Sequence, residues 1–412
     1  MRVSRPVPRR ALVAASACLA CVALPATARA APDAVATPTV AGPPALVAWS
    51  SGRDVLVAGP DGAGRRVVAR LRSERDLDSL TLSADGRRLA LVTSRFESLS
   101  TASDLIRAVR VADLTAGGPL RTLARNSSHE IVSWSPDGQR ALLVGDTIRL
   151  CDVAAQTPCR GVARNVRGRY GATWAPDGLR FAYVRAQAGR RPQGPAPEAS
   201  NLVVGDGTGR ERTVERERRS GRRGTLTVNP VWTARGLAWT TLSVAFAEDL
   251  QDARFTRSST RLLGADGRRR TVAALPVSRR TILPFVLASD SPSGEPIGVR
   301  SVYRGTAEDS LVDELVRVTP SGTISPWGLT LANDVLIDGG VRDEYLGTLA
   351  DGRAAVARTV AERRSPSRID EPRTPADWNV TVHLVGPNGS LGPVLASAFG
   401  AIAVATPYPA AP

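Results

Sequence analysis

The sequence contains no lysine and very little histidine or cysteine. Its 54 strongly basic residues are all arginine, and it has two histidines, four cysteines, one methionine and 4% aromatic residues. Without lysine, a phosphate-binding loop ending in Gly-Lys-Ser/Thr is excluded. His129 and His383 cannot form a three-histidine zinc site, and a structural role is expected for both. No Gly-x-Ser-x-Gly motif is present, which excludes the nucleophile elbow of α/β-hydrolases.

Acidic residues offer few candidates for a metal site. Asp76 with Asp78, and Glu308 with Asp309, form acidic pairs in loops that could hold calcium. Calcium loops of the Asp-x-Asp-x-Asp-Gly type are absent, however, and acidic turns are usually solvated. We therefore predict no metal and no cofactor.

The first 30 residues have the pattern of a secretory signal peptide. Four arginines within the first ten residues precede an apolar run at 11–24, and Ala28-Arg29-Ala30 matches the small-x-small pattern of a cleavage site. The run is too short for the ~20 apolar residues of a spanning helix. We expect cleavage after Ala30, no membrane span, and a secreted, periplasmic or cell-envelope location.

Two variants of this export prediction are open. Arg9-Arg10 is compatible with twin-arginine export as well as with an ordinary Sec signal. A weak lipoprotein-like box before Cys21 leaves a lipid anchor as an alternative to a free protein.

Cys151 and Cys159 are the two cysteines that follow the predicted leader. They flank a turn at 152–158 between two short strands. Cysteines that face each other across a hairpin can meet disulfide geometry, and an exported protein encounters oxidising conditions. We predict a structural disulfide rather than a zinc site, because no second Cys/His pair lies nearby.

One turn motif recurs along the chain. Its clearest copies are Trp-Ser-Pro-Asp-Gly at 134–138 and Trp-Ala-Pro-Asp-Gly at 174–178, with weaker copies at 82–86, 232–236, 291–294 and 349–352. Proline presets φ, aspartate accepts a backbone N–H two residues on, and glycine takes positive φ. Continuous apolar runs follow the turns, as expected for strands buried on both faces. The Asp-Gly turns are Asp85-Gly86, Asp137-Gly138, Asp177-Gly178 and Asp351-Gly352.

A second series of turns alternates with the first, and together they count the repeats. The second series lies at 59–62, 114–117, 154–157, 205–209, 264–267, 319–322 and 386–389. The two series predict an all-β fold, a single β-propeller with seven blades of roughly 40–60 residues. Six blades are the alternative, if one degenerate copy is an insertion.

The last strand-like run, at 401–406, has no blade of its own. We expect it to pair with the strand near Trp49, because closing the ring in this way removes two exposed sheet edges. The predicted organisation is a signal peptide at 1–30, a linker at 31–44, the β-propeller at 45–408 and a tail at 409–412.

The Trp-Ser-Pro-Asp-Gly motif, followed by Ala-Leu-Leu-Val or Phe-Ala-Tyr-Val, resembles the repeat of TolB-type propellers. The resemblance extends over nearly the whole chain beyond the leader and is clearest in the blades at Trp134 and Trp174. It implies the fold more directly than a function. TolB proteins have an N-terminal α/β domain that recruits envelope partners, and this chain is expected to lack it. It is also expected to lack the hydrolase domain that accompanies propellers in prolyl-oligopeptidase-like enzymes.

A basic region between residues 190 and 223 is the strongest candidate for a binding surface. It could be a docking patch for an anionic polymer. Alternatively, it is a solvated strand and loop whose charge is offset by Glu211, Glu215 and Glu217. The absence of aromatic residues that would stack on bases favours the solvated interpretation. The candidate binding residues are Arg190, Arg191, Arg210, Arg212, Arg216, Arg218, Arg219, Arg222 and Arg223.

From these observations we predict a monomeric, non-enzymatic binding or scaffold module. It would engage a protein, peptide or glycan through rim loops or the central channel, since loops on a rigid ring commonly carry binding sites. The alternative is a propeller lyase or hydrolase with acidic and arginine residues lining the channel.

Overall fold

The computed structural model describes an all-β chain between residues 46 and 405. Its strands number 29, with no helix among the described residues, and thus none that could cross a bilayer. The described residues are 46–59, 62–73, 77–96, 105–129, 131–155, 157–168, 171–186, 200–220, 223–246, 253–276, 281–290, 295–303, 311–319, 321, 323–332, 340–349, 352–361, 378–386, 389–398 and 402–405.

The strands form seven antiparallel sheets, here called blades 1 to 7 and given from the inner strand outward. Blade 1 contains β29 (Ile402–Val404), β1 (Val47–Ser51), β2 (Asp54–Ala58) and β3 (Arg66–Arg70). Blade 2 contains β4 (Leu77–Leu82), β5 (Arg88–Phe96), β6 (Leu105–Asp113) and β7 (Arg121–Ser127). Blade 3 contains β8 (Ile131–Trp134), β9 (Arg140–Val144), β10 (Thr147–Asp152) and β11 (Arg160–Arg164). Blade 4 contains β12 (Ala172–Trp174), β13 (Arg180–Ala186), β14 (Ser200–Asp206) and β15 (Glu211–Arg216).

Blade 5 has five strands, β16 (Arg219–Ser220), β17 (Arg223–Thr233), β18 (Gly236–Phe246), β19 (Ala253–Gly264) and β20 (Arg269–Pro276). Blade 6 contains β21 (Thr281–Asp290), β22 (Pro296–Tyr303), β23 (Leu311–Val318) and β24 (Ile324–Ala332). Blade 7 contains β25 (Val341–Thr348), β26 (Ala354–Ala361), β27 (Trp378–Val385) and β28 (Leu391–Ala398).

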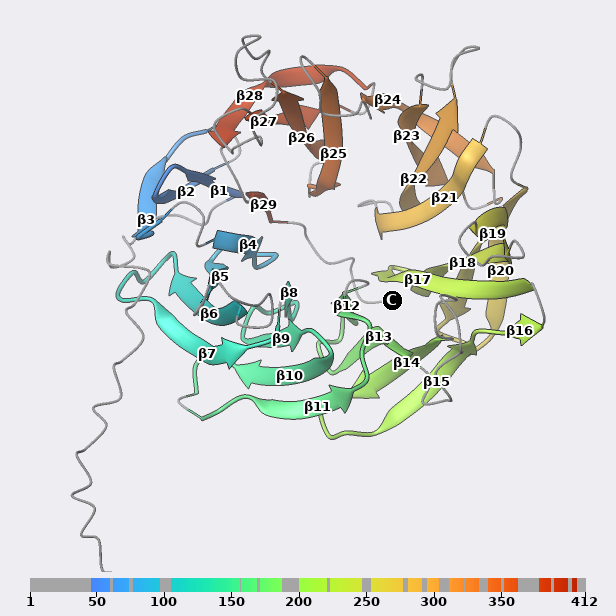
Figure 1. Ribbon diagram of the computed structural model, residues 1–412, viewed down its shortest axis with the longest axis horizontal. Helices are drawn as coiled ribbons and strands as arrows, with labels where there is room; N and C mark the ends of the chain where they lie inside the picture. The colour runs from blue at the N-terminus through green and yellow to red at the C-terminus, as the bar shows by residue number, and fades with distance from the viewer. Residues whose placement is uncertain are drawn as a thin grey trace, which may run out of the picture. The chain divides into compact units, whose positions relative to one another are not determined.

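The blades follow one another around a ring (Figure 1). The inner strands of consecutive blades are in contact all the way round, in the order β29, β4, β8, β12, β17, β21, β25 and back to β29. This arrangement is a seven-bladed β-propeller and confirms the fold and the blade count predicted from the turns.

The two ends of the propeller meet in blade 1. The C-terminal strand β29 pairs with β1, with Val404 opposite Val47, Ala403 opposite Ala48 and Ile402 opposite Trp49. In Figure 1 the short red β29 lies beside the blue β1. The predicted closure of the ring by the last strand is therefore confirmed.

The Asp-Gly motif forms the turn between the first two strands of several blades. In blade 3 the Asp137 carboxylate accepts the Gln139 N–H at 3.0 Å and the Ser135 hydroxyl at 2.5 Å. Although burial opposes ionisation, these hydrogen bonds hold the pKa of Asp137 below its usual value. The glycine of each of the four Asp-Gly turns has positive φ, from 64° at Gly138 to 84° at Gly352. Asp351 lies outside the described residues.

The same motif also joins neighbouring blades. In blades 2 and 3 the arginine after the turn reaches the next blade: Arg88 donates to the Gly138 carbonyl at 2.9 Å, and Arg140 donates to the Gly178 carbonyl. In the opposite direction, the indole N–H of Trp134 donates to the Thr81 carbonyl at 3.0 Å. The repeat thus fixes the spacing between blades as well as the turn within each blade.

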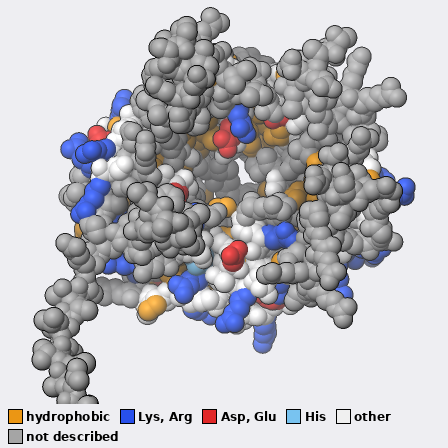
Figure 2. All heavy atoms as spheres, viewed as in Figure 1, with side chains coloured by type: hydrophobic (Ala, Val, Ile, Leu, Met, Phe, Trp, Pro, Cys, Tyr) orange, Lys and Arg blue, Asp and Glu red, His pale blue; other side chains and the backbone are white. Residues whose placement is uncertain are grey.

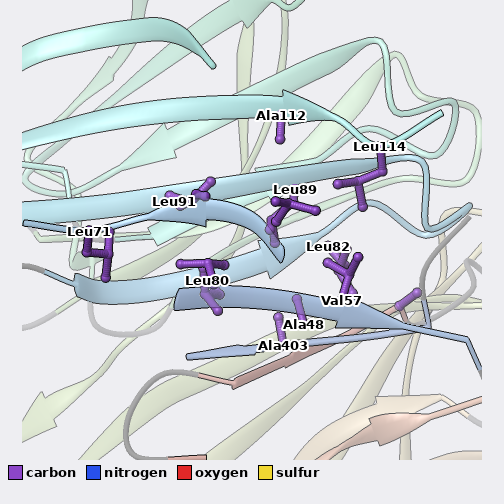
Figure 3. Packing of buried hydrophobic residues seen from close by; sticks show 14 residues of the cluster. Ala48, Val57, Leu71, Leu80, Leu82, Leu89, Leu91, Ala112, Leu114 and Ala403 are labelled. Carbon is purple, nitrogen blue, oxygen red and sulfur yellow. The ribbon is translucent and has the colours of Figure 1, made fainter. Parts of the chain in front are cut away.

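Apolar side chains fill the space between the sheets. Between blades 1 and 2, Leu80, Leu82, Leu89 and Leu91 pack against Val57 (Figure 3). These side chains are at most 6% exposed and lie on one face of their strands. On the opposite face of β5, Ala90 and Val92 are each 1% exposed and pack towards blade 3, so both faces of this strand are buried, as its continuous apolar sequence predicts.

The predicted disulfide is confirmed. Cys151 at the end of β10 is bonded to Cys159, which directly precedes β11, with 4.3 Å between the Cα atoms. The bridge closes the hairpin that connects the two outer strands of blade 3.

Candidate functional site

A groove of about 1030 Å³ lies where the outer strands of blades 3 and 4 meet. We call it the arginine groove, because four arginines contribute to its lining. Its residues are Thr147 and Arg149 of β10, 161–164 of β11 with the adjoining Asn165, Arg185 and Ala186 of β13, Asn201 of β14, Gly209 before β15, and Glu211, Thr213 and Arg216 of β15. Arginine, asparagine and threonine side chains make this lining rich in hydrogen-bond donors.

Two side chains that line the groove, Arg185 and Glu211, form one hydrogen-bonded cluster with the neighbouring Tyr183. The Arg185 guanidinium donates to the Glu211 carboxylate and to the Tyr183 hydroxyl, which itself donates to Glu211 at 2.5 Å. The guanidinium also lies over the Tyr183 ring, 5.4 Å from its centroid. Tyr183 is fully buried, and its contacts fix the positions of the Arg185 and Glu211 side chains.

The cluster fixes its own charge state. Burial, followed by the hydrogen bond to Glu211, raises the pKa of Tyr183 and keeps the phenol protonated. Burial acts against ionisation of Glu211, but the hydrogen bonds from Arg185 and Tyr183 outweigh it and lower the pKa of that carboxyl. Glu211 and Arg185 therefore form an ion pair with no net charge.

The other three arginines of the groove differ from Arg185. Among the residues that the structure describes, Arg149, Arg164 and Arg216 have no carboxylate within ion-pair distance. All three are exposed. The groove consequently has a net positive charge that is available to a ligand.

The structure brings one of the predicted binding residues into this groove, Arg216. Arg210, Arg212, Arg218 and Arg223 are exposed on or beside β15 and β17. Arg219 belongs to β16, an added strand that the sequence did not predict. Arg190, Arg191 and Arg222 lie outside the described residues. In Figure 2 many arginine side chains (blue) lie near the outer margin of the face in view.

Arg149, Arg164 and Arg185 are groove residues that sequence reasoning missed. They are scattered over three strands of two blades, so no local cluster marks them. The signal that could have found them is strand register. Arg185 pairs with Asn201, Asn201 pairs with Arg216, and the residue after Asn165 forms a bridge with Arg185.

The three glutamates of the basic region do not pair with the arginines of that region, within the described part of the chain. Glu211 pairs with Arg185, and Glu215 pairs with Arg261 at 2.9 Å and Arg269 at 3.4 Å. Glu217 is buried and accepts backbone N–H groups. The region thus keeps more free positive charge than its composition suggests.

Both histidines are buried and contact polar groups of the protein. His129 is 4% exposed, with its ring nitrogens next to the Ser127 hydroxyl at 2.5 Å and the Thr147 hydroxyl at 3.2 Å. Burial, with a smaller effect from Arg149, lowers its pKa. His383 contacts Thr381 and the Gly392 carbonyl. No group of three potential metal ligands occurs among the described residues. Asp76, Glu308 and Asp309 lie outside them.

Comparison with known proteins identifies the fold and no family. No protein-family model and no curated protein matches the sequence. The tricorn protease matches with a TM-score of 0.51 and 10% identity, over 90% of this chain and 35% of that one. An acylaminoacyl peptidase from Pyrococcus horikoshii matches with a TM-score of 0.46 and 15% identity, over 77% of this chain and 45% of that one.

An oligogalacturonate lyase in complex with manganese gives a TM-score of 0.46 and 12% identity, covering 85% of each chain. This chain spans less than half the length of the archaeal peptidase that it matches. At such low identity the similarity is one of fold, and the propeller occurs in proteins of different function.

Proposed function

We propose that the chain is an exported binding module of the TolB-type propeller class, and that it binds an anionic ligand in the arginine groove. The observation that supports this most directly is the set of exposed arginines, Arg149, Arg164 and Arg216, that come together from two blades and have no carboxylate partner among the described residues. A guanidinium group offers two parallel N–H donors to a carboxylate or phosphate, which gives both affinity and orientation.

Binding is favoured over catalysis by the chemistry of the groove. Among the described residues that line it, the one carboxylate is that of Glu211. Arg185 and Tyr183 hold it ionised, and its lowered pKa makes it a poor general base. Tyr183 is buried and protonated, so it is a poor base as well. A lyase or hydrolase would need a base with a pKa near the working pH.

The exposed arginines beside the groove have a second role in this proposal. Arg210 directly precedes β15, and Arg212 lies within it. Arg218 follows the C-terminal end of β15, and Arg223 begins β17. Exposed charges of one sign accelerate the approach of an oppositely charged ligand more than they tighten the final complex. Export rests on the signal-like segment at 1–30, and the Cys151–Cys159 disulfide suits an oxidising compartment.

The test is the binding of defined polyanions to the purified protein by titration calorimetry at 0.15 M salt. The probes are a hyaluronan oligosaccharide, which has one carboxylate per disaccharide, and a short polyphosphate. The triple variant R149Q/R164Q/R216Q is expected to bind at least about tenfold more weakly, since each charged hydrogen bond contributes about 1.5 kcal/mol or more.

The control is R53Q, which removes one exposed arginine from the turn between β1 and β2 on a different blade. It should bind within about twofold of the parent, because surface charges beyond a Debye length of about 8 Å are screened. The proposal fails if the parent binds neither probe, or if R53Q weakens binding as much as the triple variant.

A further inference from the structure

Three of the four arginines of the groove, Arg164, Arg185 and Arg216, form a row, and the ion pair of Arg185 with Glu211 lies between the other two. Strand pairing places Arg185 opposite Asn201 and Asn201 opposite Arg216. On the other side, Val166 bridges to Arg185, so Arg164 at the end of β11 lies two residues from that bridge. The order across the two blades is therefore Arg164, Arg185 and Arg216.

The middle position of this row has no free charge. Arg185 is occupied by Glu211 and by the ring and hydroxyl of Tyr183. The two flanking arginines, Arg164 and Arg216, have no such partner among the described residues. Three strand spacings separate the backbones of Val166 and Arg216, which is roughly 14 Å at 4.8 Å per spacing, and Arg164 lies two residues before Val166 along the chain.

A ligand that matches this row has its anionic groups well apart. Thr213 lines the same part of the groove and offers a hydroxyl to uncharged polar groups. A chain with charge on every unit would place an anion at the middle position, where Arg185 is already neutralised. Burying an anion there without a free partner is unfavourable.

We propose that Glu211 is a specificity-determining residue: by neutralising Arg185 it makes the groove select anionic chains with spaced charges over chains with contiguous charges. This inference rests on the proposed function of the groove. It names the ligand class as a linear polyanion in which charged and neutral polar units alternate.

The experiment compares the same two probes on the parent and on E211Q. In E211Q the side chain keeps its shape and its acceptor oxygen, but Arg185 has a free positive charge. We expect polyphosphate to bind at least about fivefold more tightly to E211Q, as one new attraction at about 5 Å in an exposed site predicts. Hyaluronan binding should change by about twofold or less, because carboxylates over the flanking arginines lie farther from Arg185 and the Coulomb attraction falls with distance.

The matched control is E215Q on the same strand. It makes the same charge change, but Glu215 pairs with Arg261 and Arg269 of blade 5 and does not line the groove. E215Q should shift both probes equally and by less than about twofold. A double variant, R185Q/E211Q, restores a neutral middle position and should return the parent's preference even if E211Q melts early.

The outcomes separate the two proposals. If E211Q leaves both affinities unchanged, or raises them by the same factor, Glu211 does not determine specificity although the groove still binds anions. If neither the parent nor E211Q binds either probe, the proposed function fails together with this inference. If E211Q gains more affinity for hyaluronan than for polyphosphate, the proposed role of Glu211 in specificity is contradicted.

Discussion

Glu217 connects blades 4 and 5 through a buried carboxylate. Its two oxygens accept the backbone N–H of Ser200 at 2.5 Å and of Thr227 at 2.6 Å, and its own N–H donates to the Ser200 carbonyl. The residue is 7% exposed. Burial raises the pKa of Glu217 to about 7, although the two N–H groups and the charge of Arg167 act in the opposite direction.

This pKa predicts a specific dependence of stability on pH. The unfolded chain releases the Glu217 proton near its ordinary pKa of 4.5, whereas the folded chain holds it until about pH 7. Between these values the folded state binds more protons, so its free energy of unfolding falls as pH rises. Between pH 4.5 and about 7, this one residue lowers the free energy of unfolding by about 3 kcal/mol, because a difference of one pKa unit corresponds to about 1.36 kcal/mol.

The measurement is urea unfolding of the parent and of E217Q from pH 4.5 to 8. E217Q lacks the titrating group, so the difference between the two proteins isolates it from all other residues. We expect the parent to become less stable relative to E217Q as pH rises towards 7, and the difference to level off above that. A constant difference would show that Glu217 has an ordinary pKa in the folded state.

At the scale of single residues, the sequence predicted roles that depend on local geometry. The disulfide of Cys151 and the turn hydrogen bonds of Asp137 follow from a few neighbouring residues, and both were predicted correctly. The arginine groove was missed apart from Arg216, because Arg149 and Arg185 meet it only through the packing of one blade on another. Composition also could not show that Glu215 forms an ion pair with Arg261 of blade 5.

At the scale of the element, the turn motif does more than reverse the chain. Arg88 follows the turn of blade 2 and reaches across to blade 3, where it donates to the Gly138 carbonyl at 2.9 Å and to the Gln139 side chain at 3.0 Å. The sequence pattern predicted the turn from proline, aspartate and glycine. It did not predict the bridging role of the arginine, because that role needs the position of the next blade.

Replacing Arg88 with alanine should therefore weaken the contact between blades 2 and 3. We expect R88A to lower the free energy of unfolding by about 1–2 kcal/mol, as the loss of two hydrogen bonds from a charged donor predicts. Its neighbour Arg87 serves as control, since its side chain is 63% exposed and lies 3.9 Å from Asp85. R87A should cost less than about 0.5 kcal/mol. Equal losses for the two variants in urea unfolding would contradict a bridging role.

At the scale of the whole molecule, counting turns was enough to predict a ring of seven blades. The second series of turns has seven members, one in each blade. The first has six, because in blade 1 the closing strand β29 takes the place of a strand joined by such a turn. The fifth strand of blade 5 was not predicted, because β16 has only two residues, Arg219 and Ser220, in a charged segment without an apolar pattern. Short strands of this kind form by pairing with a neighbour already in place, here the start of β17.

Closure of the ring by β29 predicts that the propeller depends on its last strand. Removing residues 401–412 would leave the inner edge of β1 unpaired beside the buried Trp49, and would expose apolar surface that Ala403 and Ala405 now cover. We expect a loss of at least about 3 kcal/mol in the free energy of unfolding, from the lost ladder hydrogen bonds and apolar burial. We also expect concentration-dependent self-association through the free edge. Urea unfolding and sedimentation velocity would measure the two effects.

A control that removes only 408–412 keeps β29 and should behave as the parent. If the longer deletion matched this control in both measurements, the ring would not need its closing strand, and the three pairs between β1 and β29 would contribute little to its stability.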